Sequence, residues 1–397
     1  MQAPSTVPLI EIGWLVAGEL EALDREAVEG ARDQLLAHLS GALPQFVWRM
    51  PLLRRRRLVE LPRVEPVPLL EAAAVEREAH AWDFVLVITD AELMSRYTTF
   101  ALGMPARALS AAVLSTAHLE PAPAAGGSEE AARHTLRCRI ERLAMHLLGH
   151  LAGLKHCDDP RGAMWQVRLA RDLDGIRGFL PEELASLAHE LQDVADLRLE
   201  EEPGPRPHPV RFYLRSAWHN RGDVLANVRQ IAPWRFPLRF GRLTIAAVST
   251  LLVLLITAES WDLGMSQRLG VTSAFAVASV VGATVFVLQR QRLLVRRPAR
   301  LTEQTVVTNL SMALSVAVGL TTTWLLLFAI VLAFGLLLFP DDLVRGWAAS
   351  LERQPGIDRY LVFSGFVATL GILIGALGAS FEPGGYFRHV AYIDEET

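Results

Sequence analysis

The chain has 397 residues, and its 39 basic and 43 acidic side chains give a formal net charge of −4 at pH 7. Hydrophobic residues make up 51% of it and the mean hydropathy is +0.26, which is high for a soluble protein of this length. Two cysteines exclude a disulfide framework and agree with a reducing compartment. Residues 1–205 carry 31 acidic and 21 basic side chains, so the charge of the first half argues against a nucleic-acid partner.

The first half alternates between strand and helix patterns. Residues 7–15 predict a strand, residues 20–39 predict a helix with apolar positions at helical spacing, and residues 69–80 predict a second helix. A last helix is expected from Pro181 to about Leu197, because proline suits the first turn and the two glutamates that follow it face the helix dipole. This order predicts an α/β fold for residues 1–199.

Three histidines are spaced like the ligands of a zinc peptidase. His146 and His150 are four residues apart, so on a helix they lie on one face. Gly153 lets the chain leave the helix through a conformation that a Cβ would resist, which brings His156 round as a third ligand. Three neutral imidazoles with an open fourth position are typical of a catalytic zinc site. The alternative is a helix whose histidines only form local hydrogen bonds.

The same segment and its surroundings resemble the archaemetzincins, a family of metzincin zinc peptidases. Residues 84–93, with Thr89 and Asp90, are similar to a strand and Thr-Asp turn of that family, residues 99–103 to its second strand, and residues 111–115 to its edge strand. Residues 156–164 are similar to the stretch after the third histidine, with Met164 at the position of the Met-turn. The resemblance covers about residues 5–195. It implies a metzincin-like fold with one zinc on His146, His150 and His156.

One departure from the family concerns catalysis. The family has a glutamate after the first histidine that acts as general base on the zinc-bound water, and here Leu147 stands at that position. Other carboxylates near the motif do not match the required geometry by helix spacing, namely Glu141, Asp158 and Asp159. The sequence therefore predicts no catalytic residue at this site.

A second departure concerns a further zinc, which the archaemetzincins hold with four cysteines. The resemblance places Cys157 at one of these positions and Gly162, Leu180 and Glu183 at the other three. We therefore expect the second metal site to be lost.

The second half of the chain is apolar. A polar, proline-rich linker at residues 200–209 leads into a basic segment, up to residue 242, whose aromatic residues are typical of a membrane interface. Four apolar segments follow within residues 243–380, at 243–258, 271–288, 306–339 and 361–380. Four such segments favour membrane spans over a buried helical hairpin in a soluble protein. Residues 243–380 are thus predicted to be an all-α multi-pass transmembrane domain, and residues 381–397 a tail.

Arginine placement predicts the orientation of the spans. Five arginines precede the first span and five lie between the second and third, whereas residues 259–270 and 340–360 are near neutral or slightly acidic. The arginine-rich loops are expected on the cytoplasmic side. No apolar leader opens the chain, so both termini and the first half are expected in the cytoplasm, at the inner membrane.

Two features of the spans bear on partners. Small residues recur every four positions in two of the spans, which permits close helix packing within the chain or in a homo-oligomer. They are Ser311, Ser315 and Gly319 in one span and Gly371, Gly375 and Ala379 in the other. No charged residue lies in the core of a span, so the usual signature of an ion-coupled transporter is missing. Membrane lipid is the one partner that the composition itself implies.

Three functional hypotheses remain. The first is a catalytically inactive metzincin-like membrane protein, a pseudopeptidase, that keeps one zinc and binds a protein or peptide in the former substrate cleft, with a sensing or scaffolding role. The second is an active membrane-tethered zinc peptidase with an unconventional base. The third is an oligomeric channel or assembly scaffold. Metal analysis of the purified protein separates the first two from the third.

Overall fold

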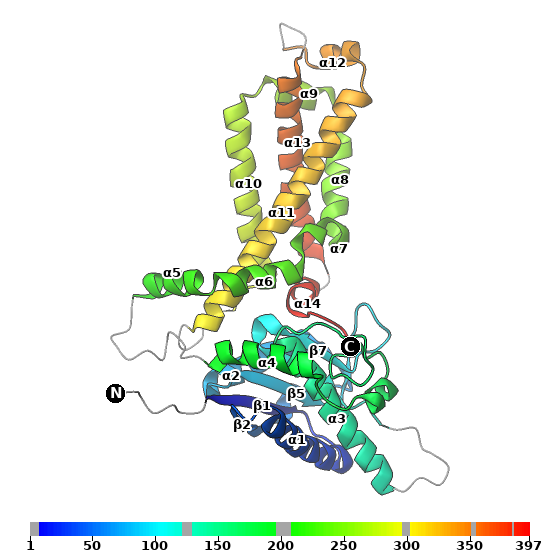
Figure 1. Ribbon diagram of the computed structural model, residues 1–397. Helices are drawn as coiled ribbons and strands as arrows, with labels where there is room; N and C mark the ends of the chain where they lie inside the picture. The colour runs from blue at the N-terminus through cyan, green and yellow to red at the C-terminus, as the bar shows by residue number, and fades with distance from the viewer. Residues whose placement is uncertain (1–7, 121–128, 196–207, 296–301, 351–354, 383–384) are drawn as a thin grey trace. The chain divides into compact units, whose positions relative to one another are not determined.

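The protein is described by a computed structural model over residues 8–120, 129–195, 208–295, 302–350, 355–382 and 385–397. The chain forms two compact units (Figure 1). The first combines Met1–His208 with two short segments from the second half, Pro298–Gln304 and His389–Thr397. The second comprises Pro209–Arg297 and Thr305–Arg388.

The first unit is built on a mixed sheet with the strand order β2-β1-β5-β8-β7. The interior strands β1 (Leu9–Ala17), β5 (Phe84–Thr89) and β8 (Ala111–Ser115) run parallel to one another. Strands β2 (Val47–Arg49) and β3 (Leu52–Arg55) both pair in parallel with β1. At the other edge β7 (Gly103–Ala106) runs antiparallel to β8. A separate two-stranded sheet joins β4 (Arg63–Val64) and β6 (Glu92–Leu93).

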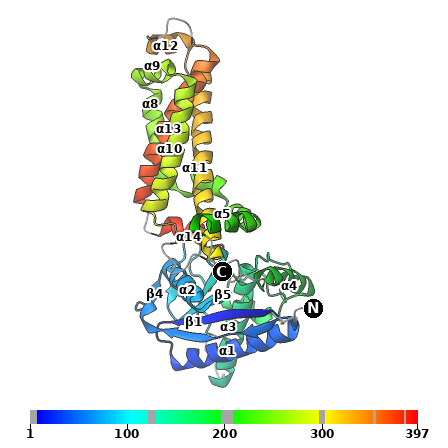
Figure 2. The same cartoon turned by 90° about the vertical axis from the view of Figure 1, so that its left-hand side faces the viewer.

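Helices cover both faces of this sheet (Figure 2). Helices α1 (Ala22–Ala42) and α3 (Glu129–Leu151) pack on one face, against alternate strand residues such as Trp14 and Leu86. Helix α2 (Pro66–His80) contacts β5 and β8 on the other face. Helix α4 (Pro181–Ala195) contributes Leu187 and Leu191 to the core shared by α1 and α3. Because both faces of the interior strands are covered, these strands are buried along almost their whole length.

The predicted α/β class is confirmed, and one strand assignment is wrong. Residues 111–115, expected at the edge, form β8 in the interior between β5 and β7. The edge strand is β7, which begins at Gly103, where the second strand was expected to end. The predicted helix end at Leu197 lies outside the described residues.

The second unit is helical. Among the residues that the structure describes, three helices are long and apolar enough to cross a membrane, and a bent pair of helices would make a fourth span if it is counted as one. The three are α10 (Leu269–Arg290), α11 (Glu303–Leu337, which begins in the first unit) and α13 (Ile357–Gly378), the last extended by a short turn to Phe381. The bent pair consists of residues Arg221–Arg239 and of α8 (Gly241–Leu255), with a bend of 49° between them. The first member of the pair contains α6 (Arg221–Ile231) and α7 (Phe236–Arg239). Shorter helices complete the unit, namely α5 (Pro209–His219), α9 (Ala258–Ser266), α12 (Asp341–Trp347) and the first three residues of α14 (Tyr386–Tyr392), whose other four residues belong to the first unit.

The third apolar segment is one continuous helix. At 1.5 Å per residue the 35 residues of α11 extend about 52 Å, more than the roughly 30 Å of a hydrocarbon core. In the most apolar window of α11 only 28% of residues are buried, against 61% in α13. Helix α13 is therefore the centre of the bundle, and α11 and α10 expose apolar side chains on its outside, as lipid contact requires.

The small residues of the spans pack within the chain. A Cβ at Gly375 would lie 3.1 Å from the Ala247 Cβ and from the Leu243 carbonyl oxygen of α8, and a Cβ at Gly371 would lie 3.2 Å from Leu327 of α11. Gly319 faces the Phe236 ring in the same way. Contacts within the chain therefore explain why glycine stands at these three positions, and no contact with a second copy of the chain is needed to explain them.

Candidate metal centre

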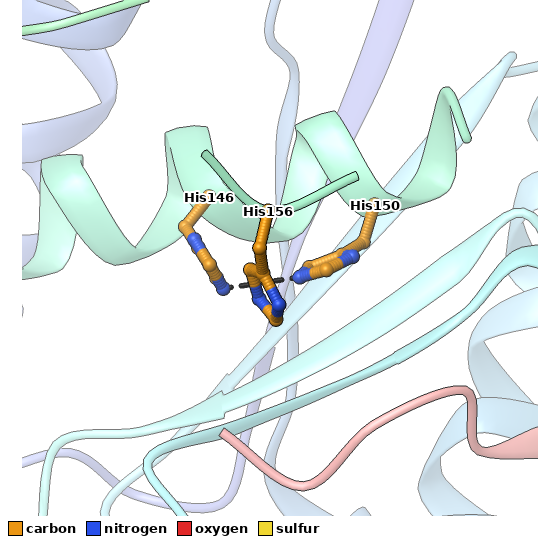
Figure 3. A group of neighbouring side chains, drawn as sticks. All are labelled: His146, His150 and His156. Atoms are coloured by element: carbon orange, nitrogen blue, oxygen red, sulfur yellow. Dashed lines mark hydrogen bonds between the residues drawn. The ribbon is translucent and has the colours of Figure 1, made fainter. Parts of the chain in front are cut away.

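The three histidines converge at the C-terminal end of α3 (Figure 3). One ring nitrogen from each of His146, His150 and His156 lies within 4.8 Å of the other two, and the Nε2 atoms of the first two are 3.1 Å apart. Two nitrogens bound tetrahedrally to one zinc at 2.0–2.1 Å would be about 3.4 Å apart. This donor set therefore fits a zinc ion. In the part of the chain that the structure describes, no other group of three such donors comes together.

The turn after α3 is the one that the sequence predicts. Gly153 has φ of +81°, its N–H donates to the carbonyl of His150 at 2.9 Å, and the chain turns back so that His156 faces the helix. The positive φ favours glycine here, and a Cβ at Gly153 would lie 2.6 Å from Cζ of Arg107, so the end of that flexible side chain would have to move.

The loop after His156 orients the first histidine. Nδ1 of His146 donates to the carbonyl oxygen of Ala163 at 2.8 Å, which leaves Nε2 with a free lone pair facing the other two rings. The next residue, Met164, is fully buried and lies against Gly149 of α3, where a Cβ would come within 3.3 Å of Met164 Cε and closer still to Sδ. Met164 thus lies beneath the histidines, between the helix and the loop that fixes His146.

Burial keeps two of the three imidazoles, those of His146 and His150, neutral. Burial lowers the pKa of His146 to about 4. Burial, reinforced by the neighbouring imidazoles of His146 and His156, lowers the pKa of His150 to about 2. Both rings are therefore unprotonated at pH 7, which is the form that binds a metal. His156 is exposed, so the site opens to solvent on that side.

Leu147 is fully buried and is not part of the donor set. Its Cδ1 lies 2.9 Å from the place where Gly103 of the edge strand β7 would carry a Cβ. The residue after the first histidine therefore fills space between α3 and β7 with an aliphatic side chain that can neither take nor deliver a proton.

The four positions assigned to the second zinc come together in space. A Cβ at Gly162 would lie 2.7 Å from Sγ of Cys157 and 3.0 Å from both Leu180 and Glu183. The buried Glu183 carboxylate accepts the N–H groups of Met164 at 3.3 Å and Leu180 at 2.7 Å. Burial, followed by the hydrogen bond and charge of Glu183, raises the pKa of the Cys157 thiol to about 11. The resemblance implies a cluster of four thiolates at these positions, and this chain has the neutral thiol of Cys157 and the carboxylate of Glu183 there. The Glu183 carboxylate instead connects the loop to α4 by hydrogen bonds.

Two of the three carboxylates considered from the sequence have other partners. Glu141 lies 3.7 Å from Nδ1 of His38, and Asp159 pairs with Arg161 at 2.8 Å. The carboxylate beside the histidines is instead Glu395, whose Oε2 is 3.6 Å from Nε2 of His150 and 3.4 Å from Nε2 of His156. Sequence reasoning missed Glu395, because no local spacing connects it to residues 146–156. The segment that carries it, residues 389–397, belongs to the first unit.

The comparisons with known proteins point to one family without establishing membership. No model of a protein family matches the chain. The chain is 30% identical to an archaemetzincin of Natronomonas pharaonis over 89 residues, which are 22% of this chain and 51% of that protein. The match thus spans about half the length of the relative.

Among solved structures, an archaemetzincin from Methanopyrus kandleri is 20% identical with a TM-score of 0.36, covering 48% of this chain and 99% of that one. A zinc-dependent peptidase from Methanocorpusculum labreanum is 22% identical with a TM-score of 0.33, covering 44% and 99%. An archaemetzincin from Archaeoglobus fulgidus is 17% identical with a TM-score of 0.33, covering 45% and 99%.

Proposed function

We propose that the first unit is an archaemetzincin-like domain that binds one zinc through His146, His150 and His156 and does not hydrolyse peptides. The observation that carries the proposal is the pairing of a convergent histidine set, in which His146 and His150 are neutral, with the buried Leu147 at the next position. The first feature supports a metal, and the second removes the proton acceptor that a peptidase of this kind needs.

Zinc held by three imidazoles would lower the pKa of a bound water to about 7 and so supply hydroxide near neutral pH. Peptide hydrolysis also requires a proton for the leaving amine, and a positioned acid-base group contributes roughly 10² to 10⁴ in rate. Leu147 supplies neither proton transfer. We therefore assign the site a binding or sensing role, with a protein or peptide as the partner in the former substrate cleft.

Elemental analysis of the full chain in detergent tests the metal. We expect near one zinc per chain, lost in His150→Ala and kept in His189→Ala, which replaces an exposed histidine of α4. Zinc content that is negligible in the native chain would contradict the proposal.

Peptidase assays test the inactivity. We expect no cleavage of unstructured peptides above background by the native chain, and weak cleavage after Leu147→Glu if the introduced carboxylate reaches the metal. Zinc-dependent cleavage by the native chain that disappears in His146→Ala would refute the pseudopeptidase assignment.

We further propose that the second unit anchors this domain at the cytoplasmic membrane as a multi-pass protein with both termini in the cytoplasm. Three long apolar helices and one bent pair support the anchor. The arginine-rich segments before α8 and after α10 support the orientation.

An active peptidase is the second candidate, and the position of Glu395 favours it. A carboxylate 3.4 to 3.6 Å from two of the histidines is close enough to act on a metal-bound water. Under this alternative Glu395→Gln would abolish cleavage by the native chain without changing its zinc content.

A further inference from the structure

The segment that carries Glu395 lies along the exposed edge of the sheet. The N–H of Thr397 donates to the carbonyl of Gly103 at 3.0 Å, and the N–H of Gly103 donates back to Thr397 at 3.2 Å. The N–H of Asp394 donates to the carbonyl of Pro105 at 3.0 Å. Two residues that exchange both backbone hydrogen bonds are typical of an antiparallel pair of strands. The residue numbers agree, because they rise along β7 from Gly103 to Pro105 while those of their partners fall from Thr397 to Asp394. The tail thus adds a strand-like segment to β7, which is otherwise the edge.

Two acidic side chains fix the tail on either side of Glu395. The carboxylate of Asp394 accepts the N–H of Arg107 at 2.6 Å, at the end of β7. The carboxylate of Glu396 accepts the N–H groups of Arg96 at 2.8 Å and Tyr97 at 2.9 Å, and contacts Nε2 of His389 at 2.7 Å. These hydrogen bonds hold the backbone in register, and those of the ionised Glu396 are charge-assisted.

Alternation along an extended segment then directs Glu395 to the opposite side. Successive side chains of a strand point to opposite faces, so the residue between two anchored neighbours points away from both anchors. The side chain of Glu395 accordingly meets His150 and His156. In Figure 3 the faint red segment that enters below the three rings is part of this tail.

The separations of Glu395 from His150 and His156 match those of two ligand atoms around one ion. At 3.4 and 3.6 Å from two Nε2 atoms, the Oε2 atom is at or beyond the usual length of an N–H···O hydrogen bond. Two ligand atoms on a tetrahedral zinc are about 3.4 Å apart. The carboxylate approaches from the His150 and His156 side, where the site is open.

We propose that Glu395 is the fourth ligand of the metal held by His146, His150 and His156, so that the tail closes both the metal site and the edge strand. The inference rests on the proposed metal site and deepens it. A site with three imidazoles and one carboxylate has no open position for water, and β7 paired with the tail has no free edge for an extended peptide. A peptide partner therefore has to displace residues 394–397.

Zinc affinity and coordination in the full-length protein test this proposal. Chelator competition should show at least a tenfold loss of affinity in Glu395→Gln and no change in Glu182→Gln, a matched replacement of an exposed glutamate on α4. Zinc K-edge absorption should show three imidazoles with a protein carboxylate in the native chain, and a water oxygen in place of the carboxylate in Glu395→Gln. Glu396→Gln, which keeps the ligand and weakens its anchor, should give a smaller loss of affinity.

Protection of the tail gives a readout that needs no spectroscopy. Digestion from the C-terminus by a carboxypeptidase should release Glu395 more slowly with zinc than with chelator, and this difference should vanish in His150→Ala.

The outcomes separate this inference from the proposed function. Equal zinc affinity and unchanged coordination in Glu395→Gln would overturn the fourth ligand and leave the three-histidine site intact. Loss of peptide cleavage in the same variant at unchanged affinity would also overturn it, in favour of a base. A native chain that binds no zinc would overturn the metal site itself.

Discussion

Replacing Gly149 by alanine tests whether the contact between α3 and Met164 supports the metal site. Gly149 lies between the two helical histidines, and its missing Cβ leaves the space that Met164 Sδ occupies. Met164 is fully buried, so it cannot swing into solvent. Overpacking of this kind costs about 1 to 3 kcal/mol, whereas alanine in a helix gains about 0.5 to 1 kcal/mol over glycine. The difference between these ranges is about 0 to 2.5 kcal/mol, and we expect a net loss of about 1 to 2 kcal/mol, near the middle of that range.

Thermal unfolding of the full chain in detergent with chelator measures this loss, and zinc affinity is measured separately. For a unit of about 200 residues, 1 to 2 kcal/mol corresponds to a Tm about 2 to 8 °C lower. Gly41→Ala, on α1 with nothing within 4 Å of the added Cβ, should be neutral or stabilising. In combination with Met164→Ala, Gly149→Ala should cost less than it does alone, because the methionine no longer occupies the space. A Gly149→Ala variant as stable as Gly41→Ala would refute the packing argument.

Three further outcomes are expected. Burial raises the pKa of the Asp24 carboxyl above its value in the unfolded chain, so ionisation of this group weakens folding as pH rises through that window. Asp24→Asn should therefore raise the Tm at pH 7, and the gain should shrink towards pH 4, as paired thermal melts would show. Gly375→Val should destabilise the helical unit by about 1 to 3 kcal/mol while leaving zinc affinity unchanged, because the added atoms meet α8. In a cysteine-free background, thiol labelling of intact cells should reach cysteines placed at Ser266 and Ser350 and miss one at Ser186, and the opposite pattern would reverse the proposed topology.

Local patterns in the sequence predicted the local parts of the site. The shared helix face of His146 and His150 and the left-handed turn at Gly153 follow from spacing and from the conformational freedom of glycine, and both are present. The apolar segments of the second half follow from composition in the same way. Such features depend on residues a few positions apart, so a single sequence contains what is needed to infer them.

Features that depend on distant pairing were missed. Whether β7 or β8 lies at the edge depends on which strands exchange hydrogen bonds, and both segments are short and buried. The position of Glu395 depends on the tail pairing with β7, which no periodicity in residues 389–397 indicates. A run of three acidic residues at 394–396 is ordinarily read as solvated. Only the fold shows that the outer two are anchored on the protein and that the middle one faces the histidines.

The order of the chain connects the tail covalently to the helices of the second unit. Residues 389–397, which supply Glu395, follow α13 in the chain, and Gln304 at the start of α11 donates to the Ala108 carbonyl at 3.2 Å. Two segments from the apolar half of the chain therefore belong to the unit that contains the three histidines. If zinc binds more tightly with the tail in place, any event in the helices that favours release of the tail must weaken zinc binding, and zinc must oppose that event by the same free energy. A tenfold effect of Glu395 on affinity would set this coupling at about 1.4 kcal/mol. Under the proposed function this linkage needs no peptide cleavage, because binding of the metal and release of the tail are themselves the coupled events.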